Sequence, residues 1–285
     1  MSTVLSVGLV ARDFVYKLLK VMHMLSSSNY SMITVKYNNR KLIHFYTHYE
    51  GLQVIDELLI LNQYDLAYRL KPRVVIDVGA HIGAFSIPMA LNILDLYGDG
   101  LVIAVEPATI NYRALVNNVM INGVKKIVKP IKVAVSANQS PIEIEWIGMK
   151  ELVASITMTQ LLEFIKNYGY NTIDLIKMDI EGAELEIITK DSEWLDHTKV
   201  LVMELHPWIY DIDGMTKIVK TLRRKGFTMK MIGRKVDTRY ALIKWIKIVN
   251  LSPSQLLLTL WKSCLSIYPK SVSIQYWIAY KTLHS

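Results

Sequence analysis

From Arg73 onward, short runs rich in β-branched residues alternate with longer stretches of helical character. The runs cover residues 74–76, 101–105, 131–135, 173–178 and 200–203. Such alternation is typical of crossover units, in which successive strands lie parallel in one sheet and helices connect them. Two further runs, at 227–232 and 273–280, bring the expected number of strands to seven. The pattern predicts an α/β fold with a mostly parallel, seven-stranded sheet and helices on both faces.

The first 70 residues follow a different pattern. Apolar side chains at helical spacing predict an amphipathic helix over residues 4–25. Two strand-like runs, 33–37 and 41–46, flank the turn sequence Asn38-Asn39-Arg40 and predict a hairpin. A helix is expected at about 54–70. We therefore divide the chain into N-terminal additions (1–70) and a main domain (71–285) with an insertion at about 233–272.

The composition is that of a folded protein without disulfides. Apolar residues make up 52% of the 285 residues and charged residues 20%, which provides a sizeable core and excludes wholesale disorder. Cys264 is the single cysteine, so intramolecular disulfides and cysteine-based zinc sites are excluded and a cytoplasmic location is expected. The chain has no run of the ~18 apolar residues that a membrane span requires, so no spanning segment is expected.

The net charge of +8 is concentrated in one stretch. Residues 233–272 contain seven basic residues and one acid, a net of +6, interleaved with apolar residues that include Trp245 and Trp261. This mixture suits peripheral contact with an anionic membrane surface. Contact with nucleic acid and a solvated face over a core, with the tryptophans as packing residues, are the alternatives.

A turn that contains two glycines follows the first strand of the main domain. Asp77 ends this strand, and Gly79 and Gly83 lie in the turn before a helix that begins near Ala84. In open α/β sheets, ligands bind beyond the carboxyl ends of the strands. Glycine at both positions removes side chains that would obstruct a ligand. We therefore interpret the turn as a cofactor site.

A second acidic residue supports this interpretation. Glu106 ends the next strand, 23 residues after Gly83, close to the ~20 residues expected before an acid that holds a ribose. A carboxylate there can accept two hydrogen bonds from a vicinal diol. In the structural alternative, the glycines merely make a tight turn and Glu106 is a solvated strand end.

The residues of the turn argue against a nicotinamide cofactor. The dinucleotide fingerprint is Gly-x-Gly-x-x-Gly, which lets a pyrophosphate rest on a helix N-terminus. Here three other residues separate Gly79 from Gly83, and Asp77 precedes them. An anionic carboxylate beside the turn suits a ligand with ammonium and sulfonium groups better than it suits a pyrophosphate.

Over roughly residues 50–210, the chain resembles the FkbM-type methyltransferases. Four blocks carry the resemblance in order: 74–83, 105–107 with Asn118 and Asn122, 134–136, and 174–184. The chain departs from the family pattern at His81, where Asn is usual, and at 157–161, where a Leu-Asp pair usually precedes the helix.

This resemblance implies a class I methyltransferase, Rossmann-like fold. It also implies transfer of a methyl group from S-adenosylmethionine, usually to a hydroxyl oxygen of a small molecule or sugar. The expected cofactor-binding residues are Asp77, Gly79, Ala80, His81, Gly83, Glu106, Pro107 and Ala134.

The candidate catalytic residues follow the fourth and fifth strands. Asp179 is the expected base for a hydroxyl acceptor, and Lys177 lies two residues earlier on the same side of the strand. His206 is a second candidate for orienting or deprotonating the acceptor, with a structural histidine as the alternative. Glu181 and Glu184 are expected in the first turn of the next helix, where negative charge is favourable. No specific ligand spacing indicates a metal.

Two other functions compete with a small-molecule or glycan O-methyltransferase. A nucleic-acid methyltransferase would fit the basic charge, but residues 179–182 stand where an Asn-Pro-Pro-Tyr-type motif is expected and add negative charge. A non-enzymatic, membrane-associated binding protein on the same fold would fit the amphipathic terminal segments. The intact cofactor residues argue against it.

Overall fold

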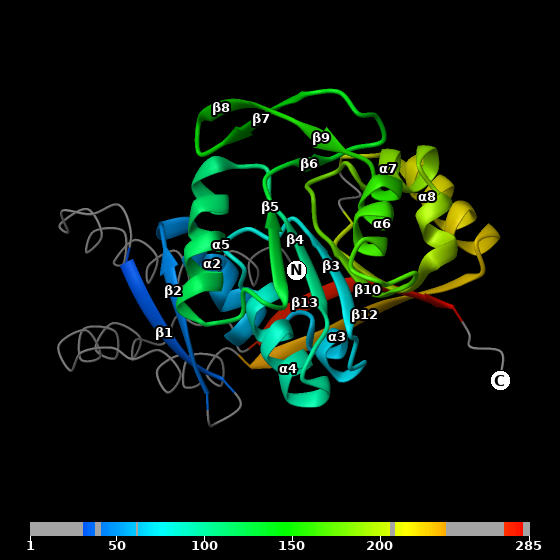
Figure 1. Cartoon of the computed structure of the whole chain (residues 1–285). Coiled ribbons are helices and arrows are strands. Elements are labelled where there is room, and N and C mark those ends of the chain that lie inside the picture. The colour runs from blue at the N-terminus through cyan, green and yellow to red at the C-terminus, as the bar shows by residue number, and fades with distance from the viewer. Residues whose placement is uncertain (1–30, 38–40, 61, 206–208, 238–270, 282–285) are drawn as a thin grey trace. The chain divides into compact units, whose positions relative to one another are not determined.

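The computed structural model of the chain describes residues 31–37, 41–60, 62–205, 209–237 and 271–281 (Figure 1). The chain is divided into two compact units. One contains Met1–Gln63 and Gly233–Ile274, and the other contains Tyr64–Ile232 and Gln275–Ser285. The expected N-terminal helix at 4–25 and most of the basic stretch at 233–272 lie outside the described residues.

The first unit contains the predicted hairpin. Strands β1 (Ser31–Tyr37) and β2 (Lys41–Thr47) pair antiparallel, with Val35 opposite Ile43 and both side chains buried. Helix α2 (Tyr49–Ile55) follows and continues as one π-helical segment, η1 (Asp56–Ile60).

The prediction of a single helix at about 54–70 is wrong. Helical structure begins earlier, at Tyr49, and stops after Ile60, and a separate short helix, α3 (Asp65–Arg69), starts the second unit. Asn62 adopts a left-handed φ of 50° between the two segments. Asparagine tolerates this conformation better than most residues, but a right-handed helix cannot continue through it.

The second unit is built on a seven-stranded sheet with the order β12-β13-β11-β10-β3-β4-β5. Strands β11, β10, β3, β4 and β5 are parallel, whereas β13 runs antiparallel to β11. The strands are β3 (Val74–Val78), β4 (Leu101–Val105), β5 (Val128–Ile131), β10 (Ile173–Met178), β11 (Thr198–Met203), β12 (Phe227–Asp237) and β13 (Ser271–Lys281). The predicted seven-stranded, mostly parallel sheet is confirmed.

Helices cover both faces of this sheet. Figure 1 shows α4 (Ser86–Tyr97) and α5 (Thr109–Ile121) on one side, and α6 (Met158–Lys166), α7 (Glu184–Lys190) and α8 (Ile212–Arg224) on the other. Ile76 and Ile103 belong to the core under α6, α7 and α8. Because side chains alternate along a strand, Asp77 and its register partner Lys177 point to the opposite face, toward α4.

The third strand was predicted at 131–135 and is displaced. The strand in the main sheet is β5, at Val128–Ile131, whereas β6 (Ala134–Val135) pairs with β9 (Ser155–Ile156) in a separate small sheet. Pro130 lies within β5. Proline has no N–H to donate, and β5 is an edge strand that pairs only with β4, so the position tolerates it.

A second hairpin of this unit was not predicted. Strands β7 (Ile142–Trp146) and β8 (Met149–Val153) pair antiparallel across a two-residue turn.

A short 3-10 helix, η2 (Glu193–His197), precedes β11. Within the described part of the chain, the helices are too short or too polar to cross a membrane.

The chain reverses its direction of travel across the sheet between β3 and β10. From β3 the order continues to β4 and β5 on one side, and from β10 to β11 on the other. In open α/β sheets, the crevice beyond the carboxyl ends of strands at such a switch point is the usual ligand site. A functional site is therefore expected at the residues that end β3, β4 and β10.

Candidate active site

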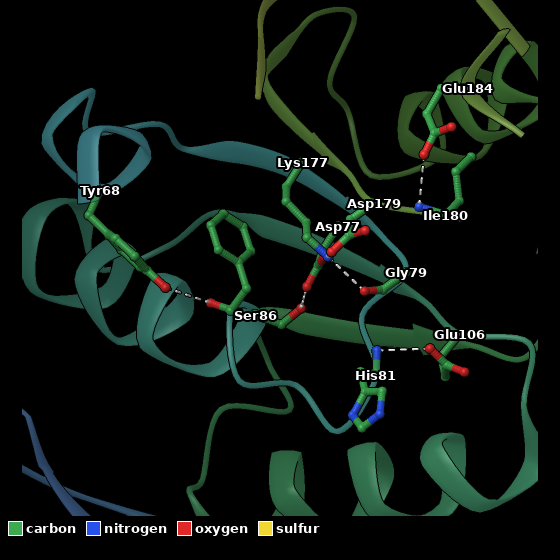
Figure 2. A network of polar contacts seen from close by, with 11 residues as sticks. Tyr68, Asp77, Gly79, His81, Ser86, Glu106, Lys177, Asp179, Ile180 and Glu184 are labelled. Carbon is green, nitrogen blue, oxygen red and sulfur yellow. Dashed lines mark hydrogen bonds and ion pairs between the residues drawn. The ribbon is translucent and has the colours of Figure 1, made fainter. Parts of the chain in front are cut away.

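Asp77 and Lys177 form a buried ion pair under the turn that follows β3. They are register partners on adjacent parallel strands, and both are almost completely buried. The Lys177 Nζ atom lies 3.4 Å from Asp77 Oδ1, and the Ser86 hydroxyl donates to Asp77 Oδ2 at 2.6 Å (Figure 2). The Asp77 carboxylate is therefore engaged by the protein, and its influence on a ligand would be exerted through these partners.

Lys177 connects the turn with Asp179. Its ammonium donates to the Gly79 carbonyl oxygen at 2.7 Å and lies 3.9 Å from Asp179 Oδ2 (Figure 2). Burial lowers the pKa of Lys177, but the carboxylates of Asp77 and Asp179 outweigh burial and hold this pKa above its usual value. The side chain thus remains a cation that links β3, the turn and β10.

The two glycines of the turn permit close contacts within the protein. Gly79 has a φ of 81°, and a Cβ atom there would lie 2.1 Å from the Asp179 carbonyl oxygen. Gly83 has a φ of 87°, and its Cβ would lie 2.8 Å from Leu115 Cδ1. From the sequence, these glycines are expected to permit the approach of a ligand. In the structure, the groups that approach them are the backbone of Asp179, immediately after β10, and the Leu115 side chain of α5.

Glu106 holds the outer part of the turn. Its carboxylate accepts hydrogen bonds from the backbone N–H of His81 at 2.8 Å, from the backbone N–H of Ala108 at 2.9 Å and from Asn111 Nδ2 at 3.2 Å. The residue is only 5% exposed, and burial raises the pKa of Glu106 to about 7 despite these three donors. Figure 2 shows the Glu106 carboxylate beside the His81 backbone.

Two buried side chains that were not predicted as site residues support the turn. Asn118 of α5 donates its Nδ2 to the Ile82 carbonyl oxygen at 2.9 Å, and Ser86 binds Asp77 as described. Asn118 belongs to the second block of the family resemblance, which was a usable signal. Ser86 and Asn111 carried no such signal, because their role depends on which carboxylate they meet in space.

Asp179 is accessible at the carboxyl end of β10. Its side chain is 29% exposed, and its backbone N–H donates to the Val78 carbonyl oxygen at 3.2 Å, which keeps it beside β3. Glu184, in contrast, is completely buried as the first residue of α7, and its Oε1 accepts from the backbone N–H of Ile180 at 3.3 Å. Glu184 thus lies in the first turn of α7 as expected, whereas Glu181 precedes the helix with a φ of 54°.

The remaining predicted residues lie around this group. Ala80 is buried in the turn, Pro107 is half-buried after β4, and Ala134 is buried in β6, outside the main sheet. His206 lies outside the described residues. In the described part of the chain, no group of three or more His, Cys, Asp or Glu side chains could hold a metal ion.

The sheet order, the antiparallel β13 and a glycine turn at the switch point together define a class I methyltransferase fold. The family model "Methyltransferase FkbM domain" matches residues 77–229, which is more than half of the 285 residues. The chain belongs to this family of methyltransferases.

A curated relative and several solved structures resemble the chain. "Methyltransferase sdnD" from Sordaria araneosa is 24% identical over 221 residues, which cover 62% of this chain and 82% of the relative. An O-methyltransferase from Bacillus cereus in complex with SAH has a TM-score of 0.45 and 12% identity, covering 82% of this chain and 89% of its own. The O-methyltransferase TomG from Streptomyces achromogenes, in complex with SAM, has a TM-score of 0.44 and 14% identity, and the match covers 80% of this chain and 79% of TomG.

Proposed function

We propose that this methyltransferase transfers a methyl group to a hydroxyl oxygen of a small molecule or glycan, with Asp179 as the base. The methyl donor is S-adenosylmethionine. The observation that carries the proposal is the partly exposed Asp179 carboxylate at the carboxyl end of β10, which Lys177 connects directly to the turn after β3. Acceptor and donor sites would therefore share one cation.

The residues of the turn fit this donor. An ionised carboxylate has about four lone-pair positions, and Glu106 uses three of them for protein donors, so it can still accept a hydrogen bond from a ribose hydroxyl. Gly79 and His81 are only partly covered by the protein and would contact the donor through the backbone. Asp77 is completely buried and would act as a positioning residue through Ser86 and Lys177. The bound donor supplies a sulfonium with an electrophilic methyl group.

On the acceptor side, Asp179 would orient a hydroxyl group and accept its proton. The Lys177 ammonium lies 3.9 Å from this carboxylate and helps to keep its position. Orientation of two reactants can contribute about 7–11 kcal/mol to lowering a barrier. General-base help adds roughly 10²–10⁴-fold in rate. Most of the acceleration is thus expected from positioning, and Asp179 contributes to both effects.

The charges at this edge of the sheet disfavour a polyanionic acceptor. Asp179, Glu181 and Glu204 follow β10 and β11, and the nearby cation, Lys177, is buried and already bound to Gly79 and Asp77. Among the described residues at this edge, a nucleic acid would bring its phosphates toward these carboxylates, which is unfavourable. A neutral hydroxyl acceptor meets no such repulsion.

The substitution Asp179→Asn tests the proposal. It removes the base and keeps the size of the side chain, so we expect turnover to fall by roughly 10²–10⁴-fold while donor affinity stays within about twofold. Transfer of labelled methyl from S-adenosylmethionine into acceptor fractions measures turnover, and calorimetric titration with S-adenosylhomocysteine measures affinity. Glu186→Gln, an exposed carboxylate of α7 that pairs with Lys190, is the matched control. Undiminished turnover of the Asp179 variant would contradict the assigned base.

A cytoplasmic location and contact with an anionic membrane stay predictions. The second depends on residues 233–272, most of which lie outside the described part of the chain.

A further inference from the structure

The β7–β8 hairpin is anchored beside the donor site. Glu151 of β8 accepts hydrogen bonds from the backbone N–H of Thr109, at 3.1 Å, and from its hydroxyl, and pairs with Lys132 at 3.7 Å. Thr109 is the first residue of α5 and follows Glu106 by three positions. These contacts hold the hairpin next to the strand end that would bind the ribose.

A second contact joins the hairpin to the turn after β3. The Trp146 ring at the end of β7 packs edge-to-face on the His81 ring, with centroids 5.3 Å apart and an interplanar angle of 72°. His81 is the residue whose backbone N–H donates to Glu106. The hairpin therefore contacts both parts of the site, through Glu151 at the start of α5 and through Trp146 at the turn after β3.

The indole N–H of Trp146 is buried and has no hydrogen-bond partner among the described residues. Buried indole N–H groups normally find an acceptor, because an unsatisfied one is unfavourable. Trp194 shows the usual arrangement in this chain, since its indole N–H donates to the Asp191 carbonyl oxygen. The Trp146 donor is thus available for an acceptor that the described residues do not supply.

The turn that presents Trp146 is strained. Trp146 pairs with Met149 across Ile147 and Gly148, and Ile147 has a φ of 52°. A β-branched residue is a clear outlier at this φ, and such strain is often found at ligand clamps. Ile147 is also 47% exposed. Burial of the Ile147 side chain therefore does not explain the conformation of this turn.

We propose that Trp146 is a donor-binding residue, and that the β7–β8 hairpin covers the adenosine part of bound S-adenosylmethionine. Its indole N–H donates to an acceptor atom of the adenosine, and its ring shields the same group from water. This inference rests on the proposed donor site at Glu106 and the turn. It identifies Trp146 as a residue that recognises the donor and takes no part in the proton transfer.

Trp146→Phe tests the inference because it removes the N–H and keeps an aromatic ring. We expect S-adenosylhomocysteine to bind about fivefold more weakly in calorimetric titration, as for the loss of one hydrogen bond. The wild-type protein should show a saturable change in tryptophan fluorescence that the variant largely loses. Leu152→Ala is the matched control, since Leu152 is 76% exposed on β8 of the same hairpin and should leave both readouts unchanged.

A measurement on the wild-type protein does not depend on a variant. Oxidative footprinting should show Trp146 protected several-fold by S-adenosylhomocysteine. Unchanged affinity and fluorescence response in Trp146→Phe, or no protection of Trp146 in a wild type that binds the ligand, would overturn the inference alone. Failure of the wild type to bind S-adenosylhomocysteine would instead contradict the donor site on which it rests.

Discussion

Asp77 and Glu106 are both buried carboxylates, yet the protein stabilises them differently. Asp77 has a cation, Lys177, as an ion-pair partner, together with the Ser86 hydroxyl. Glu106 has three neutral donors and no cation within ion-pair distance among the described residues. Burial raises the pKa of both carboxyl groups, at Asp77 despite Lys177 and Ser86, and it brings the pKa of Glu106 to about 7. This residue can change its protonation state near neutral pH.

We predict that donor affinity depends on pH through Glu106. A ribose hydroxyl donates to the ionised carboxylate, so binding requires loss of the proton that the free protein holds below a pKa of about 7. The apparent Kd for S-adenosylhomocysteine should therefore rise up to tenfold for each pH unit below 7 and level off above pH 8. Calorimetric titrations from pH 5.5 to 8.5 measure this. Glu106→Gln should bind more weakly with no such dependence, and a pH-independent wild type would speak against the role of Glu106.

The same residue affects folding stability with a defined sign. The folded state binds the Glu106 proton more tightly than the unfolded chain does, because the pKa rises from 4.5 to about 7. The contribution of Glu106 to stability is complete below pH 4.5 and is lost as pH rises through about 7. A bound donor, which favours the ionised form, opposes this loss.

Among the elements, the turn between β3 and α4 is constrained from two sides. The Lys177 ammonium donates a hydrogen bond to the Gly79 carbonyl oxygen, and the Asp179 carbonyl oxygen occupies the space that a Cβ of Gly79 would need. The carboxyl ends of β3 and β10 are thereby brought together at one point. A substitution that displaces this turn would move both the proposed donor site and the proposed base, Asp179.

Gly79→Ala should therefore destabilise the protein and abolish donor binding. The positive φ costs about 1 kcal/mol for alanine, and the contact with the Asp179 carbonyl oxygen adds about 1–3 kcal/mol. Gly123→Ala is the matched control, because Gly123 has a φ of 67° and open space where the Cβ would lie. Chemical denaturation should give a loss of about 1 kcal/mol for the control and a clearly larger loss for Gly79→Ala. Equal losses would show that the close contact is unimportant.

For the whole molecule, the proposed donor site lies where the strand order of the sheet reverses, and it joins elements that are distant in sequence. Asp77 and Lys177 are in register on β3 and β10, and Asn118 of α5 reaches the turn from a third element. A ligand held there would contact residues on both halves of the sheet. Its binding energy should therefore appear as global stability.

We predict that S-adenosylhomocysteine, the product that remains after the donor has lost its methyl group, raises the unfolding temperature of the protein. A ligand at 100 times its Kd stabilises the folded state by about 2.7 kcal/mol, which corresponds to a shift of about 5–10 °C for a domain of this size. Differential scanning calorimetry with increasing S-adenosylhomocysteine measures the shift. The variant Asp179→Asn should show the same shift as the wild type, since it retains the donor site. No shift at saturating ligand would count against a donor site at the switch point.

Much of the fold could be read from the sequence because it depends on periodicity. The β-branched runs located six of the seven strands of the main sheet, and Asn38-Asn39-Arg40 marked the turn of the N-terminal hairpin. Periodicity was insufficient where a single residue decided the path. Asn62 ended a helix that the apolar pattern continued, and the chain left the sheet after Ile131 although Ala134 and Val135 suggested a strand.

The sequence by itself determined that Asp77, Gly79, Glu106 and Asp179 lie at the carboxyl ends of their strands, because strand order along the chain and the acid after each strand are local properties. Only the tertiary structure decided what these groups contact. Lys177 became the link between Asp77, Gly79 and Asp179, and Trp146 came to lie against His81. Such contacts join residues as far apart in sequence as Asp77 and Lys177, which are separated by 100 positions. They depend on strand register and burial, which no local pattern encodes.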